Sequence, residues 1–218
     1  MKKFNAKLLE AYFICGTQDL QPKENLPTVL EQALKAGITA FQFRDKGQNS
    51  TLAVSERVPM AQKLHQLCQK HHVPFFVDDD VALAKAVDAE GIHVGQSDEA
   101  ITQVVTEVGQ KMIVGYSCSN LAEIVKANTI SGIDYYGCGP IFATQSKDDA
   151  SPVIGIPGLR QLVQNSNRPI VAIGGIKEED LPAIAQTQAA GAAVISLIAQ
   201  SSNYQQTIQA IRNAPWIN

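Results

Sequence analysis

The segment QFRDK alternates polar and aromatic side chains in a pattern that suits a strand facing a ligand. Successive side chains of a strand point to opposite faces, so Gln42, Arg44 and Lys46 would share one face. Phe41 and Phe43 would occupy the other face and pack beneath helices. A guanidinium fork beside an ammonium group can bind a mono- or diphosphate. The pattern predicts a phosphate-binding face, and its alternative is a solvated, charged loop.

Carboxylates follow the next two apolar runs of the chain. Asp78, Asp79 and Asp80 end one run, and Asp98 closes the segment GIHVGQSD. Where neighbouring parallel strands end together, two such carboxylates suit Mg²⁺, whose other ligands are water and substrate phosphate oxygens. We therefore expect a magnesium site here. The alternative for Asp98 is the N-cap of a helix beginning at EAITQVV.

Two later segments carry hydroxyl and amino groups. Ser117 ends the run MIVGYS, where it could contact a ligand or close a turn. The segment GCGPIFATQSK offers Thr144, Ser146 and Lys147 as donors to a phosphorylated ligand. The polar stretch over residues 142–155 is predicted to be a mobile lid, with an ordinary loop as the alternative.

The segment VAIGGI places two glycines at the end of the seventh apolar run. Backbone N–H groups of Gly174 and Gly175 could surround a phosphate that a side chain would exclude. Ile195 and Ser196 lie in the eighth run and would be beside these glycines. Loops after strands seven and eight are the usual phosphate site of a (β/α)₈ barrel.

The histidines give weaker signals. His65, His71 and His72 fall on or beyond the second helical segment, where we expect them to be solvated. His93 lies within the fourth apolar run, where a hydrogen-bonded histidine of the barrel wall is expected in preference to a catalytic one.

These residues are distributed over eight short apolar runs that alternate with segments of helical period. Such alternation predicts a parallel sheet, because parallel neighbours need a crossover. Eight regular units without a dinucleotide fingerprint favour a single (β/α)₈ TIM barrel over residues 1–218, rather than a doubly wound open sheet. Pro59 is expected to split or kink the second helix. The runs span residues 11–15, 38–43, 73–77, 91–95, 112–117, 134–141, 169–175 and 192–198.

Composition narrows the class of protein. The 218 residues carry a net charge of −3, so no basic field indicates nucleic acid or an anionic membrane. No apolar run approaches the roughly 20 residues of a membrane span. The 4 cysteines lack zinc-site spacing and indicate a reducing compartment. The opening MKKFNAKLLE makes a poor export signal, so we expect a cytoplasmic protein.

The same motifs, taken in order, resemble the thiamine phosphate synthase family. The resemblance runs from about Tyr12 to Ala199 and implies a (β/α)₈ barrel. It also implies an enzyme, a transferase that joins a pyrimidine methyl diphosphate to a thiazole phosphate, plain or carboxylated. The products would be thiamine phosphate and pyrophosphate, formed with Mg²⁺ through a pyrimidine carbocation. The motifs are QFRDK, DD (78–79), GIHVGQSD, GYS (115–117), DYYGCGPIFATQSK, VAIGGI and VIS (194–196).

The resemblance also assigns site residues. The pyrimidine diphosphate would be held by Gln42, Arg44, Lys46, Asp78, Ser117 and Lys147. The thiazole phosphate would be held by Thr144, Ser146, Gly175, Ile195 and Ser196. Mg²⁺ would be held by Asp79 and Asp98. Catalytic roles would fall to Arg44, Lys46, Ser117 and Lys147. The partners are then these two small molecules, without nucleic acid or membrane, and a homodimer is compatible with the sequence.

One departure from the family pattern concerns the aspartate triplet. The family usually has Asn-Asp-Arg where this chain has Asp78, Asp79 and Asp80, so position 78 gains a negative charge and position 80 loses a positive one. We hypothesise that Asp78 either joins the metal shell or stays protonated.

Three alternatives to a synthase remain from the sequence. They are a thiazole tautomerase-like relative, a non-catalytic thiamine-phosphate-binding barrel, and another phosphosugar barrel.

Overall fold

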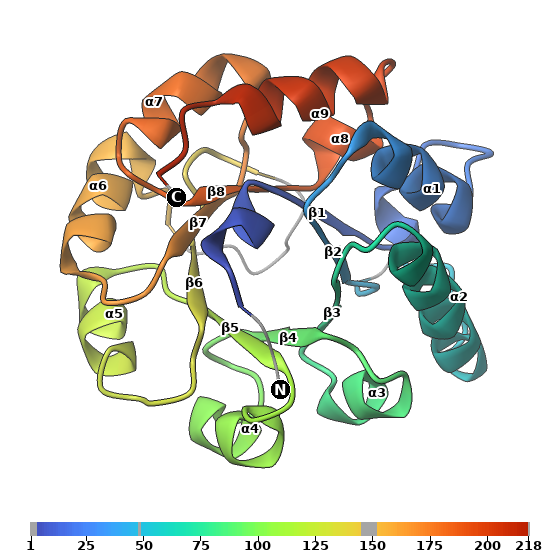
Figure 1. Ribbon diagram of the computed structural model, residues 1–218, viewed down its shortest axis with the longest axis horizontal. Helices are drawn as coiled ribbons and strands as arrows, with labels where there is room; N and C mark the ends of the chain where they lie inside the picture. The colour runs from blue at the N-terminus through green and yellow to red at the C-terminus, as the bar shows by residue number, and fades with distance from the viewer. Residues whose placement is uncertain (1–3, 48, 145–151, 218) are drawn as a thin grey trace.

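The strands of the protein close into a parallel barrel (Figure 1). The structure is a computed structural model that describes residues 4–47, 49–144 and 152–217. Each strand pairs with the next one in the chain, and β8 returns to pair with β1. This arrangement confirms the predicted (β/α)₈ barrel. The strands are β1 Ala11–Cys15, β2 Ala40–Phe43, β3 Phe75–Asp78, β4 Gly91–Val94, β5 Ile113–Ser117, β6 Tyr135–Cys138, β7 Ile170–Ile173 and β8 Gly191–Val194.

Helices surround the barrel as an outer ring (Figure 1). Their ends follow local sequence signals, as the first one shows. The Asn25 side chain accepts the backbone N–H of Thr28 at 3.0 Å, and Gly37 ends the helix with φ 95°. The helices are α1 Leu26–Ala36, α2 Arg57–Lys70, α3 Val81–Ala86, α4 Ile101–Val108, α5 Leu121–Ala127, α6 Gly155–Asn165, α7 Leu181–Ala185, α8 Ser196–Ala199 and α9 Tyr204–Asn213.

Two apolar layers separate the inside of the barrel from its outside. Phe41 and Phe43 belong to the larger layer, which lies between strands and helices, as their alternation predicted. The smaller layer fills the barrel interior and includes Tyr12, Phe76 and Tyr135. The Tyr12 and Phe76 rings lie 5.3 Å apart, and the rings of Phe76 and Tyr135 meet edge to face at 6.2 Å. The interior is thus a packed core and not a pore.

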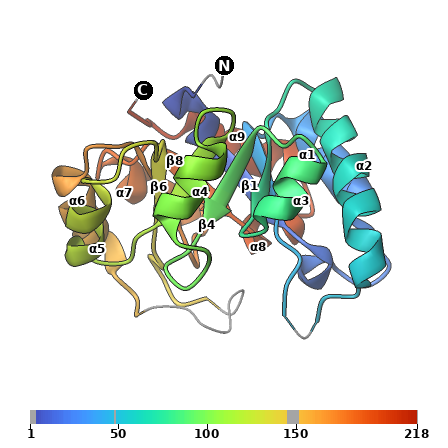
Figure 2. The ribbon, with the colours of Figure 1, turned by 90° about the horizontal axis from the view of Figure 1, so that it is seen from below.

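The N-terminal segment closes the end of the barrel where the strands begin (Figure 2). The 3₁₀ turn η1 Ala6–Leu9 precedes β1, and Leu9 is fully buried. The Phe4 ring stacks on the Tyr135 ring, with 6.1 Å between the ring centroids. The Thr39 hydroxyl donates to the Leu8 carbonyl at 3.0 Å and tethers the turn to β2. Ligands must therefore enter from the opposite end, where the strands finish.

Several local expectations need correction. Pro59 neither splits nor kinks a helix, because α2 begins at Arg57 and Pro59 falls in its first turn, where proline is tolerated. His65 is 6% exposed and not solvated; its Nε2 bonds Glu90 Oε1 at 3.0 Å. The eighth strand ends at Val194, and the rest of that apolar run forms α8. Among the described residues, no helix has the length and apolarity needed to cross a bilayer.

Candidate active site

A cavity of about 210 Å³, the mouth cavity, opens at the carboxyl ends of the strands. One wall comes from the ends of β2, β3 and β4 and carries most of the charge: Arg44, Lys46, Asp78, Asp79 and Asp98. The facing wall comes from the loops after β6, β7 and β8, because the closed strand order places them across the barrel. With the exception of Gln42, the described residues that were predicted to bind phosphate or metal therefore line one cavity.

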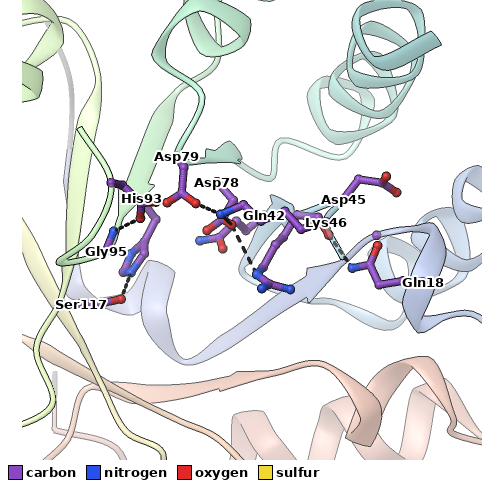
Figure 3. Close-up of polar contacts among 12 residues, drawn as sticks. Gln18, Gln42, Asp45, Lys46, Asp78, Asp79, His93, Gly95 and Ser117 are labelled. Carbon is purple, nitrogen blue, oxygen red and sulfur yellow. Dashed lines mark hydrogen bonds and ion pairs between the residues drawn. The ribbon is translucent and has the colours of Figure 1, made fainter. Parts of the chain in front are cut away.

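Asp78 links the two cations of that wall (Figure 3). Its Oδ2 lies 3.3 Å from Arg44 Nε and 3.2 Å from Lys46 Nζ. Lys46 also pairs with Asp79 Oδ2. The Asp78 side chain is 7% exposed, so little water screens these pairs. The structure therefore shows an arrangement that neither hypothesis for Asp78 foresaw, a bridge between the two cations that were predicted to bind phosphate.

The backbone of the aspartate triplet turns its side chains to different tasks. Asp79 has φ 59°, a left-handed conformation that is costly for most residues, and its N–H donates to the His93 carbonyl at 2.8 Å. This turn places the Asp79 carboxylate in the mouth cavity. Asp80 points away instead and caps α3, where its Oδ1 accepts Leu83 N–H at 2.8 Å. Asp80 is thus a structural residue.

Asp98 lies in the loop after β4 and does not cap α4. Its Oδ2 accepts the N–H of Gly95 at 2.7 Å, and the cap position of α4 is Ala100, which has no side-chain cap bond. The alternative interpretation of Asp98 is therefore wrong. Asp98 Oδ1 makes no hydrogen bond to the described residues, whereas the Asp79 carboxylate is paired with Lys46.

A magnesium ion fits this donor set in one way. Among the described residues, no group of three or more histidine, cysteine or acidic side chains could hold a metal. Two carboxylates that share one cavity can still hold Mg²⁺ if water and phosphate oxygens fill its other positions, which is the usual mode of Mg²⁺ binding. Asp79 and Asp98 meet that requirement, and their ion would lie beside Arg44 and Lys46.

The facing wall is built from small residues and backbone. Thr144, Gly175, Ile195 and Ser196 all line the mouth cavity. Gly175 has φ 64°, and a Cβ there would lie 2.5 Å from the Ala143 carbonyl, so the two loops can approach only at a glycine. The predicted residues Ser146 and Lys147 lie outside the described residues, as does half of the segment predicted to be a lid, residues 145–151.

Gln42 lies beneath the mouth cavity, and Ser117 lies at its boundary with an inner cavity. Gln42 is 2% exposed and does not line the mouth cavity. It lines an inner cavity of about 20 Å³ together with Arg44 and Ser117. Ser117 faces both cavities, and its hydroxyl lies 2.9 Å from His93 Nε2 (Figure 3). His93 is thus a hydrogen-bonded residue of the barrel wall, as its position in the strand predicted.

Comparison with known proteins identifies the family. A family model described as thiamine monophosphate synthase matches residues 11–198. The chain belongs to the thiamine monophosphate synthase family. It is 55% identical over 212 residues to the thiamine-phosphate synthase of Lactiplantibacillus plantarum, and the match covers 97% of each chain. The thiamine-phosphate synthase of Levilactobacillus brevis is 52% identical over the same length and the same share of each chain.

A solved structure of this family has the same fold. The thiamine phosphate pyrophosphorylase of Pyrococcus furiosus superposes with a TM-score of 0.81 and 31% identity. The superposition covers 95% of this chain and 96% of that one. This member of the thiamine monophosphate synthase family is accordingly a transferase of thiamine biosynthesis.

Asp45 is a supporting residue of this synthase-family site that the sequence analysis missed. Its Oδ2 accepts both the N–H and the hydroxyl of Thr17 at 2.7 Å, and its Oδ1 accepts the Ser50 hydroxyl. Gln18 donates to the Arg44 carbonyl at 2.7 Å. These bonds fasten the loops after β1 and β2 together and hold the backbone that carries Arg44. The available signal was the place of Asp45 in QFRDK, on the face opposite the cations.

Proposed function

We propose that this protein joins a pyrimidine methyl diphosphate to a thiazole phosphate, giving thiamine phosphate and pyrophosphate. The observation that supports this most directly is the shape of one cavity with two unlike walls. Cations and carboxylates from β2 to β4 suit a diphosphate with its metal. The glycine and hydroxyl groups after β7 and β8 suit a second, smaller phosphate.

The reaction needs a diphosphate to leave with a pair of electrons. The bond between the pyrimidine methylene carbon and the diphosphate oxygen breaks, and the methylene becomes cationic. The thiazole nitrogen then gives its lone pair to that carbon and forms the new C–N bond. Charge grows on the leaving oxygen, so Arg44 and Lys46, both at the cavity, act by neutralising it. Lys147 is proposed to join them.

Asp79 and Asp98 would hold Mg²⁺ in this reaction. A bound Mg²⁺ supplies positive charge to the diphosphate oxygens and so makes the diphosphate a better leaving group. Lys46 must exchange its aspartate partners for the diphosphate, and its 37% exposed side chain has room to turn. The enzyme needs no strong base, because the thiazole nitrogen is itself the nucleophile.

The cysteines support the proposed cytoplasmic location. All of the cysteines are free and buried, at positions in or beside strands and helix α2. Burial raises the pKa of each thiol, to about 12 for Cys118. Such thiols pack as small apolar groups and suit a reducing compartment.

The test is direct. Purified protein is incubated with the pyrimidine diphosphate, the thiazole phosphate and Mg²⁺, and thiamine phosphate is measured by fluorescence after oxidation. We expect equal amounts of thiamine phosphate and pyrophosphate, and no product with EDTA. Binding of both ligands without product would contradict the proposal and indicate a binding protein. Isomerisation of the thiazole without release of pyrophosphate would contradict it in favour of a tautomerase.

A further inference from the structure

A continuous chain of hydrogen bonds crosses the barrel interior beneath the mouth cavity. It begins at Gln42 Nε2, which lies 2.9 Å from Tyr12 Oη, and Tyr12 Oη lies 3.0 Å from Tyr135 Oη. Tyr135 Oη lies 3.0 Å from His93 Nδ1. His93 Nε2 then lies 2.9 Å from Ser117 Oγ. The chain thus connects Gln42 on β2 with Ser117 on β5 through three other strands.

The two tyrosine hydroxyls are sealed from water. Tyr12 is 1% exposed and Tyr135 is fully buried. Burial raises the pKa of both phenols above its ordinary value, so both keep their hydrogens. A buried hydroxyl hydrogen without an acceptor is costly, so each of these hydrogens must point to a neighbour in the chain.

The amide of Gln42 fixes the direction of these hydrogens. An amide nitrogen only donates, so the Tyr12 hydrogen cannot point to it. Within the described residues, the other polar neighbour of the Tyr12 hydroxyl is Tyr135, which therefore accepts the hydrogen. The Tyr135 hydrogen must then go to His93 Nδ1.

We propose that this chain of hydrogen bonds from Gln42 to Ser117, here called the relay, holds His93 as the tautomer with its hydrogen on Nε2. The relay thereby makes Ser117 a hydrogen-bond donor to the ligand. With Nδ1 accepting from Tyr135, the Nε2–H donates to Ser117 Oγ. The hydrogen of Ser117 then points away from His93, and Ser117 lines the mouth cavity. Tyr135 and His93 are positioning residues, because they act through Ser117.

Two glycines on neighbouring strands leave room for the relay. A Cβ on Gly115 would overlap both Tyr135 and His93, and a Cβ on Gly137 would lie 2.9 Å from His93 Cε1. The His93 and Tyr135 rings lie 5.5 Å apart. The imidazole is therefore held between strands in one orientation, which a relay of fixed direction requires.

The relay predicts what Ser117 recognises. A donor at this position selects an acceptor atom of the ligand, such as a ring nitrogen of an aromatic heterocycle, and disfavours an N–H in the same place. Its assignment to the pyrimidine rests on the proposed function. The direction of the relay does not, because it follows from contacts within the protein.

The first test reads the tautomer and needs no turnover. Protein labelled with ¹⁵N-histidine is studied by long-range ¹H–¹⁵N NMR well above the ordinary histidine pKa of about 6.5. The His93 signals are assigned from their loss in His93→Gln. We expect one tautomer in which Nε2 carries the hydrogen and Nδ1 is an acceptor. A hydrogen on Nδ1 would overturn the proposal, whether or not the protein makes thiamine phosphate.

The second test separates positioning from packing. Tyr135→Phe keeps the ring and removes the donor to His93, so we expect mixed His93 tautomers and a loss of about 3- to 10-fold in kcat/KM. In a Ser117→Ala background the same change should cost less than about twofold. An equal loss in both backgrounds would overturn the proposal. Tyr136→Phe is the matched control, since its hydroxyl bonds Asn128 at 3.3 Å, outside the relay, and should leave kcat/KM unchanged.

Discussion

Replacing Asp78 with asparagine should make the protein bind pyrophosphate more tightly and fold less stably. Asp78→Asn keeps the shape of the side chain and removes the charge that lies between Arg44 and Lys46. The two cations then repel each other until an anion restores the balance. The affinity for pyrophosphate should therefore rise by about as much free energy as the unliganded variant loses in its free energy of unfolding.

The magnitude follows from the distances. At 3.2 to 3.3 Å each pair has a gross attraction of about 5 kcal/mol for an effective dielectric near 20. Desolvation of a carboxylate that is 7% exposed offsets most of this attraction. Lys46 also retains Asp79. We therefore expect a net change of about 2 kcal/mol, which corresponds to roughly 30-fold in a dissociation constant.

The assay is calorimetric titration with pyrophosphate in the absence of metal, with urea unfolding alongside. The free energy of unfolding should fall by about 2 kcal/mol without ligand, and saturating pyrophosphate should restore most of it. Asp80→Asn is the matched control, because asparagine also caps a helix and Asp80 faces away from the cavity. If Asp78→Asn bound pyrophosphate equally well or more weakly than the wild type, the idea that Asp78 neutralises Arg44 and Lys46 in the unliganded protein would be refuted.

Further predictions concern the barrel and its surroundings. Gly115→Ala should lower the free energy of unfolding by about 1–3 kcal/mol in urea titrations, because its Cβ would overlap Tyr135, and an unchanged value would contradict this packing. The bond to Glu90 raises the pKa of His65, while bonds from His65 and the Phe75 N–H outweigh burial and lower the pKa of Glu90. The stability that protonated His65 adds is fully present below its unfolded pKa of about 6.5 and is lost as the pH rises through its folded pKa. The stability that ionised Glu90 adds is lost at acid pH. His65→Gln should therefore lower the free energy of unfolding by about 1 kcal/mol near pH 5.5 and by less near pH 8.5. A pH-independent cost would contradict it. All 4 cysteines should resist a thiol reagent in the native protein and react after denaturation, and rapid native labelling would contradict their burial.

The barrel could be predicted from the sequence because its signals are local and repeated. Apolar runs alternate with helical segments, and the alternation of Gln42 with Phe41 and Phe43 assigns inside and outside without any knowledge of neighbouring strands. Residue-level boundaries were less predictable. Pro59 was expected to break a helix because the sequence does not reveal that the helix begins only at Arg57.

The sequence could predict which residues lie in the site, but not which contacts these residues make with one another. Residues at the ends of β2 to β4 had to meet, because parallel strands of a barrel finish at one rim. The partner that each of these side chains contacts depends on how deeply the side chain is buried and on the local backbone conformation. The pairing of Asp78 with Arg44 and the placing of Asp79 by a left-handed turn are of this kind. The burial of His65 beside Glu90 is likewise a tertiary contact between distant segments.

The central claim is tested most directly by the metal dependence of thiamine phosphate formation in one conservative variant. Asp98→Asn retains an oxygen for the Gly95 N–H and removes the charge that would hold Mg²⁺. We predict that wild-type protein forms product with Mg²⁺ and that the variant needs at least about tenfold more Mg²⁺. Glu99→Gln, which changes a neighbour outside the cavity lining, should behave as wild type. Product formation by Asp98→Asn at the wild-type Mg²⁺ requirement would contradict the account.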